Sequence, residues 1–121
     1  MWVWFCEGSE RLPVSVAHCI EMAGKETVLS SMTLWETHLL LEKGRLTSSL
    51  SPTETVRLWL EEFPMRIVPV DWSIAVQSRT LEFSHEDPAD RFIAATAFHL
   101  KLPLATADQR LSRLSWLATI A

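Results

Sequence analysis

The stretch that decides the fold is His85-Glu86-Asp87-Pro88-Ala89-Asp90-Arg91-Phe92-Ile93-Ala94-Ala95-Thr96-Ala97. Asp87 and Pro88 are typical of a helix start, because aspartate caps helices and proline is tolerated in the first turn. Ile93, Ala97 and Leu100 recur at helical spacing and predict an inward face on a helix over 87–100. The run 103–106 then predicts a short strand, so this segment indicates a helix that leads directly into a strand.

The rest of the chain alternates between helix and strand patterns in the same way. Strands are predicted over 27–31, 66–70 and 116–120, and Pro69 indicates an edge position for the second, because proline cannot donate to the ladder. Strands separated by helices predict a parallel sheet with right-handed crossovers, hence an α/β sandwich. With 121 residues and no internal repeat or linker, the chain fits one domain over 1–121. The other predicted helices cover 13–23, 33–43, 51–63 and 71–81.

Composition bounds the class of function. Fifteen acidic residues against eleven Lys and Arg give a net charge of −4, which disfavours RNA binding by charge alone. An acidic balance fits a site that concentrates carboxylates and recruits a cation. The two cysteines, Cys6 and Cys19, have no zinc-site spacing and are expected to be free thiols in a reducing compartment, hence a cytoplasmic location. No apolar run approaches the ~18 residues of a membrane span, and the start does not resemble a signal peptide.

Three carboxylates follow or precede predicted strands at places where α/β proteins build sites. Sites in open α/β sheets form at the carboxyl ends of strands. Glu36 lies in the predicted first turn of the helix after 27–31, Asp108 lies just past the strand that ends at Thr106, and Asp90 starts the helix that leads into that strand. Taken singly, each acid is better explained as a helix cap, since Thr33-x-x-Glu36 reads as a capping box.

Gathered at one rim, the same acids have a second interpretation. Packed carboxylates repel one another, and their pKa values rise unless a cation neutralises them. Hard oxygen ligands of this kind suit Mg²⁺ or Mn²⁺. Thr106, two residues before Asp108, is placed to orient a ligand or a water. Spacing alone leaves the capping and the metal interpretations both open.

Three motifs resemble VapC-type PIN domains. They are Leu29-Ser30-Ser31-Met32-Thr33-Leu34-Trp35-Glu36, the stretch 85–97 quoted above, and Pro103-Leu104-Ala105-Thr106-Ala107-Asp108. Their order and spacing agree with that family along nearly the whole chain. The resemblance implies a PIN-like three-layer sandwich, with a parallel sheet flanked by helices. It also implies endonucleolytic cleavage of RNA with Mg²⁺ or Mn²⁺, control by a cognate antitoxin, and a homodimer.

The resemblance also assigns roles to the acids. Asp90 would be a direct metal ligand, Glu36 would hold the metal or its water, and Asp108 would complete the site with Thr106 beside it. Asp87 is expected to cap its helix. Arg91 is expected to pair with an acid or a backbone carbonyl; Arg91 and His85 are secondary candidates for a substrate contact.

The chain departs from the family at its start. PIN domains of this type open with a buried strand that ends in Asp, followed by Thr-His and a Trp-rich helix. Trp2-Val3-Trp4-Phe5 resembles that helix, already under way at residue 1, and the strand with its Asp is missing. The open explanations are a misassigned start, a truncated or degenerate copy, or another residue in place of the Asp. Trp2 and Trp4 are then expected to be exposed. The expected function is RNA cleavage, and the alternative is a defective PIN domain that only binds an antitoxin or itself.

Overall fold

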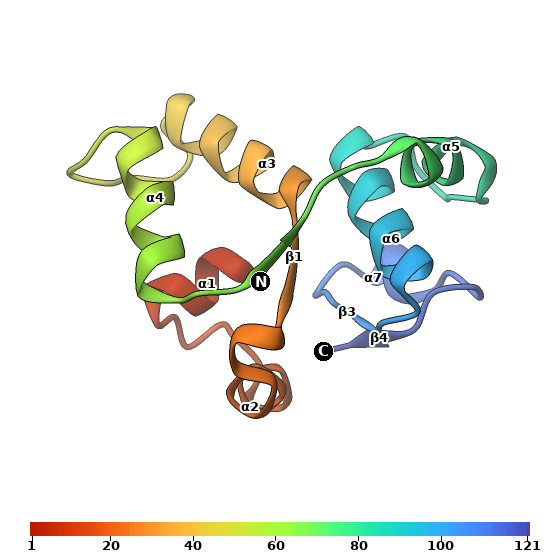
Figure 1. Ribbon diagram of the computed structural model, residues 1–121, viewed down its shortest axis with the longest axis horizontal. Helices are drawn as coiled ribbons and strands as arrows, with labels where there is room; N and C mark the ends of the chain where they lie inside the picture. Colours follow the sequence, from red (N-terminus) through yellow and green to blue (C-terminus); the bar gives the residue numbers. More distant parts are fainter.

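The computed structural model describes residues 1–121 as two groups of elements on either side of a central gap (Figure 1). One group holds α1 to α4 with β1, and the other holds α5 to α7 with β3 and β4. The helices are α1 (Trp2–Glu7), α2 (Val14–Ala23), α3 (Ser31–Glu42), α4 (Pro52–Glu62), α5 (Trp72–Thr80), α6 (Pro88–Leu100) and α7 (Gln109–Ser112), with a 3₁₀ turn at Gly24–Glu26. The strands are β1 (Val28–Ser30), β2 (Arg66–Val68), β3 (Leu104–Ala105) and β4 (Thr119–Ile120).

The helices begin at the capping residues that the sequence marks. Ser51, Asp71 and Asp87 each accept a hydrogen bond from a backbone N–H in the first turn of α4, α5 and α6. Helix α3 differs from the prediction, because it starts earlier. Its cap is Ser30, whose hydroxyl accepts a hydrogen bond from the Met32 backbone N–H. Glu36 is therefore the sixth residue of α3 and lies in its second turn, where it cannot act as the partner in a capping box.

The strands pair in parallel, as predicted, but they form two separate pairs. Strand β1 pairs with β2, and β3 pairs with β4. The prediction of an edge position for 66–70 is confirmed, because β1 is the sole partner of β2. No strand lies between β1 and β3, so each pair leaves one edge of its ladder open toward the other. This gap agrees with the absence of the family's first strand, which the resemblance places in the middle of the sheet.

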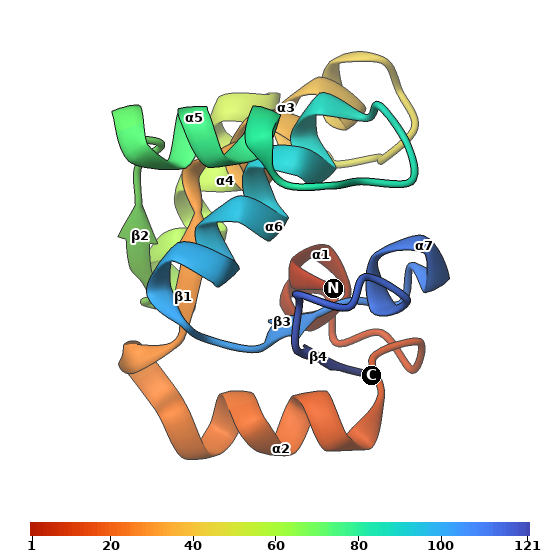
Figure 2. The ribbon, with the colours of Figure 1, turned by 90° about the vertical axis from the view of Figure 1, so that its right-hand side faces the viewer.

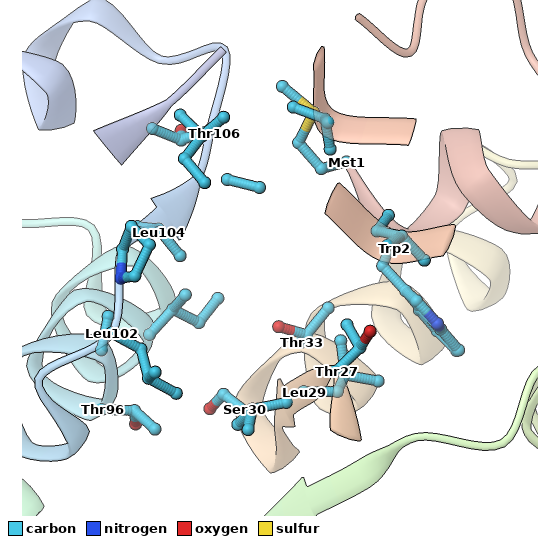
Figure 3. A pocket seen from close by; sticks show the side chains of 18 of the residues that line it. Met1, Trp2, Thr27, Leu29, Ser30, Thr33, Thr96, Leu102, Leu104 and Thr106 are labelled. Atoms are coloured by element: carbon cyan, nitrogen blue, oxygen red, sulfur yellow. The ribbon is translucent and has the colours of Figure 1, made fainter. Parts of the chain in front are cut away.

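A cavity of about 530 Å³ separates the two pairs of strands. In Figure 3 one wall carries Leu104 and Thr106, and the facing wall carries Trp2 and Leu29. Helices α2 and α6 contribute the apolar faces that the sequence predicted to be inward, and those faces line this cavity. They supply Val16, Ile20, Ala23, Ile93, Ala97 and Leu100.

The buried core is small because the cavity divides it. Only 17 of 121 residues are buried, and the largest cluster joins α6 to the C-terminal segment through Ala94, Ala97, Leu111 and Leu117. Figure 2 shows α6 beside β1 and above β3, with α2 running beneath the strands. No helix reaches the length and apolar character that crossing a bilayer requires.

The prediction that Trp2 and Trp4 are exposed is wrong for both residues. Trp4 is half-buried. Trp2 is only 6% exposed, because its ring packs edge-on against Trp59 of α4 with ring centroids 5.7 Å apart. Helix α1 is thus anchored on α4 by aromatic packing, and Met1 is brought to the rim of the cavity.

Candidate metal centre

The three acids singled out by the sequence line one cavity. Glu36 projects from α3, Asp90 from the first turn of α6, and Asp108 from the turn after β3, and Thr106 lines the same space. Helix α3 follows β1 directly, and α7 follows β3 after a turn of three residues. The acids therefore gather where two strands end, which is where parallel α/β sheets place their sites.

Within this gathering, Asp90 is shared by two groups of ligand atoms. Oxygens of Glu36, Asp87 and Asp90 lie within 4.8 Å of one another. Ligand atoms of His85, Asp90 and Asp108 form a second group within the same limit. Asp87 caps α6, as predicted, through bonds from the Ala89 and Asp90 backbone N–H groups, and it also belongs to the first group.

The Met1 amino group is the one positive charge that stabilises the Glu36 carboxylate, and the two groups form no ion pair. The Glu36 carboxylate takes part in no hydrogen bond to a cap and no ion pair, since Ser30 caps α3. Burial, and then the negative charges of Asp90 and Asp87, raise the pKa of Glu36 above its ordinary value. The capping interpretation of Glu36 is therefore wrong, and its charge is the one in this site that most needs a cation.

Asp90 is held by a histidine that the sequence ranked only as a secondary candidate. The Nε2 of His85 lies 2.9 Å from Oδ2 of Asp90, with both side chains largely buried at 11% and 20% exposed. The other ring nitrogen, Nδ1, is buried without a partner. His85 thus fixes the orientation of the Asp90 carboxylate. Its position just before the helix start was the signal that pointed to it.

Asp108 is fixed by the turn that follows β3. Its Oδ1 accepts the Arg110 backbone N–H at 2.8 Å, so Asp108 caps α7, and its own N–H donates to Oγ1 of Thr106 at 3.0 Å. The Arg110 guanidinium donates to both carboxylate oxygens, at 3.2 and 2.9 Å. The hydrogen bond from Arg110 is the main cause that lowers the pKa of Asp108. The sequence pattern did not predict this contact of Arg110 with Asp108.

Arg91 turns toward helix α5. Its guanidinium donates to the Ser78 carbonyl at 2.8 Å and to Glu86 Oε1 at 2.9 Å, and it lies 4.7 Å from the centroid of the Phe83 ring. The side chain is 9% exposed and does not line the cavity. Arg91 therefore pairs with an acid and a backbone carbonyl, the arrangement that was expected of it.

The donor set fits a hard divalent cation. Glu36, Asp87 and Asp90 offer carboxylate oxygens, which Mg²⁺ and Mn²⁺ prefer to sulfur ligands. Burial and the charges of Asp90 and Asp87 outweigh the opposing charge of the Met1 amino group and raise the pKa of Glu36. A bound cation would remove that repulsion.

Parallel strands flanked by helices, with acids gathered at the strand ends, define an α/β domain with a candidate metal centre. The family model for the PIN domain matches residues 1–117, and the chain belongs to this family. Its fold is similar to a chain in the crystal structure of VapBC2 from Rickettsia felis bound to a DNA fragment from their promoter. That match has 18% sequence identity and a TM-score of 0.70, and it covers 98% of this chain and 91% of the other. Among curated proteins, no sequence matches this chain.

Proposed function

We propose that this PIN domain is a VapC-type toxin that cleaves RNA phosphodiester bonds with Mg²⁺ or Mn²⁺. Membership of the PIN family and the likeness in fold to a VapBC complex support the class. The observation that carries the proposal is Glu36, which has no capping role and lies within 4.8 Å of Asp87 and Asp90 with a raised pKa. A half-buried acid beside two other acids weakens the metal-free fold, so a binding role is the simplest reason for it.

The chemistry divides among the acids and the residues that hold them. Glu36, Asp90 and Asp108 would hold the cation or its waters, with Asp90 common to both groups of ligand atoms. When bound, the cation would lower the pKa of a water and offset charge on the phosphodiester. His85 orients Asp90, and Thr106 orients Asp108 through its backbone N–H. The raised pKa of Glu36 makes it the acid best suited to accept a proton during attack on phosphorus.

A cleavage assay with matched variants tests this proposal. A fluorescent RNA is incubated with Mg²⁺ or Mn²⁺ and with wild type, Asp90→Asn or Glu54→Gln. Glu54 is the control, because it lies in the first turn of α4 and its carboxylate pairs with Arg57, far from the cavity. We expect Asp90→Asn to lose at least about a hundredfold in rate, in line with the removal of a charged catalytic group. Equal cleavage by wild type and Asp90→Asn would refute the site.

We also propose that the chain binds a cognate antitoxin and forms a homodimer. The support is the amount of apolar surface that lies in the open, which on soluble proteins often marks interaction sites. Helices α2, α3 and α5 carry this surface through Val14, Met22, Trp35, Trp72 and Val76. Light scattering on the purified chain measures the dimer directly, and a monomer at micromolar concentration would contradict that part.

A second function stays open on one observation. No strand lies between β1 and β3, so no acid from a middle strand reaches the cavity. A PIN domain without that acid would bind an antitoxin or itself but not cleave. Wild type that forms a dimer or an antitoxin complex, and shows no metal-dependent cleavage in the assay above, would favour this second function.

A further inference from the structure

The guanidinium of Arg110 lies against two carboxylates of the acidic site, those of Asp108 and Asp90. It folds back over two residues and donates through Nε to Oδ1 and through Nη2 to Oδ2 of Asp108. The backbone N–H of Arg110 also donates to Oδ1, at 2.8 Å. Three donors from one residue thus engage both oxygens of Asp108, and the fork geometry of the guanidinium suits such a two-oxygen contact.

The same guanidinium faces the acid that both groups of ligand atoms share. Nη2 of Arg110 lies 4.0 Å from Oδ2 of Asp90, the oxygen that pairs with His85. No other lysine or arginine forms an ion pair with Asp90 or Asp108. Arg110 therefore supplies a fixed positive charge at the Asp108 end of the site, whereas the positive charge that acts on Glu36 at the other end is the Met1 amino group.

We propose that Arg110 is a displaceable counter-ion that competes with the divalent cation for Asp108 and Asp90. A cation that coordinates Asp108 needs the oxygen lone pairs that Arg110 holds, and two positive centres on one carboxylate repel each other. Displacement is feasible, because the Arg110 side chain is 57% exposed and its recorded partners are these two acids. This role rests on the proposed metal site, and it makes Arg110 a residue that sets metal affinity without binding the metal.

Titration of the full chain with Mn²⁺ alone, followed by calorimetry, tests the competition without any RNA. The variant is Arg110→Gln, and the matched control is Arg113→Gln. Arg113 lies at the end of α7, and its side chain reaches only Gln109 Oε1, at 3.3 Å, so the control removes an equal charge nearby without touching the acids. We expect Arg110→Gln to bind Mn²⁺ about fivefold more tightly than wild type, and Arg113→Gln to stay within about twofold.

Two outcomes overturn the competition. Arg110→Gln with the same Mn²⁺ affinity as Arg113→Gln would show that the contact of Arg110 with Asp108 and Asp90 does not set the affinity. Weaker binding by Arg110→Gln would show that Arg110 prepares Asp108 for the metal. A thermal unfolding curve for each variant in EDTA establishes that it is folded.

The result also separates this role from the proposed function. Tighter Mn²⁺ binding by Arg110→Gln together with no RNA cleavage by wild type would leave the counter-ion role standing and would count against the nuclease. Absence of Mn²⁺ binding in wild type and in Arg110→Gln would overturn both.

Discussion

The contacts of the buried Arg91 guanidinium allow the loss of folding free energy on its removal to be predicted. Arg91→Met keeps most of the aliphatic stem and removes the charge. The Ser78 carbonyl lies in the last turn of α5 and has no partner within the helix, so losing the bond at 2.8 Å leaves a buried acceptor unsatisfied. A charged hydrogen bond of this kind contributes about 1.5–3 kcal/mol, and the contact with the Phe83 ring about 1 kcal/mol. Glu86 is largely exposed, so its ion pair adds roughly 0–0.5 kcal/mol.

Urea unfolding followed by circular dichroism measures this cost. The free energy of unfolding of Arg91→Met is expected to fall by about 3 kcal/mol, a large part of the stability of an ordinary domain. The matched control is Arg79→Met, because Arg79 reaches the same Glu86 at 3.5 Å but is 68% exposed. The control is expected to lose less than about 0.5 kcal/mol. Equal losses in the two variants would refute the reasoning, and a stable Arg91→Met that fails to bind RNA would indicate a substrate contact.

Two further variants test the cavity and its acid. Glu36→Gln is expected to be more stable than wild type in EDTA at pH 7. The pKa of Glu36 is raised in the folded state, so the folded state binds more protons than the unfolded state. The stability of wild type therefore falls as the pH rises from the ordinary pKa of 4.5 through the raised pKa. The difference should vanish below pH 4, and a less stable Glu36→Gln at pH 7 in thermal unfolding would contradict the assigned pKa direction. An apolar five-residue strand joined ahead of Met1 is expected to raise the melting temperature by at least about 5 °C, because it would pair with the open edges of β1 and β3. The control is the same extension with a central proline. Equal melting temperatures for the two extended chains would show that the strand does not enter the cavity.

The helices were predictable because their signals are local. Asp87 with Pro88, and Ser51 with Pro52, mark helix starts through bonds within four residues, and those starts are found where expected. The start of α3 was not predicted correctly, since Ser30 and Thr33 are both good caps. Choosing between them depends on where β1 ends, and that is set by its pairing with β2 across a long stretch of sequence.

The split of the sheet shows what periodicity leaves out. Val16, Ile20 and Ile93 repeat at helical spacing, and that pattern shows which face of each helix is apolar. It does not show what the face packs against. In the structure these faces surround the cavity between β1 and β3. The resemblance to a family with a middle strand supplied what the periodicity could not.

The contacts within the acidic site could not be predicted from the sequence for a similar reason. The resemblance to the family predicted that Glu36, Asp90 and Asp108 share one site. The spacing of these residues does not reveal which carboxylate has a positively charged partner. The pairing of His85 with Asp90 depends on the path of the loop between α5 and α6, and the Arg110 contact depends on a side-chain rotamer. Both contacts are properties of the three-dimensional structure that residue spacing does not encode.

That uneven compensation predicts effects of opposite sign at the two ends of the site. Glu36 has no ion-pair partner, so Glu36→Gln removes attraction for a cation and should weaken Mn²⁺ binding. Arg110 compensates Asp108, so Arg110→Gln removes competition and should strengthen it. A variant that only loosened the fold would weaken binding in both cases. Opposite signs in one titration, with folding verified in EDTA, would therefore separate a built electrostatic site from a chance gathering of acids.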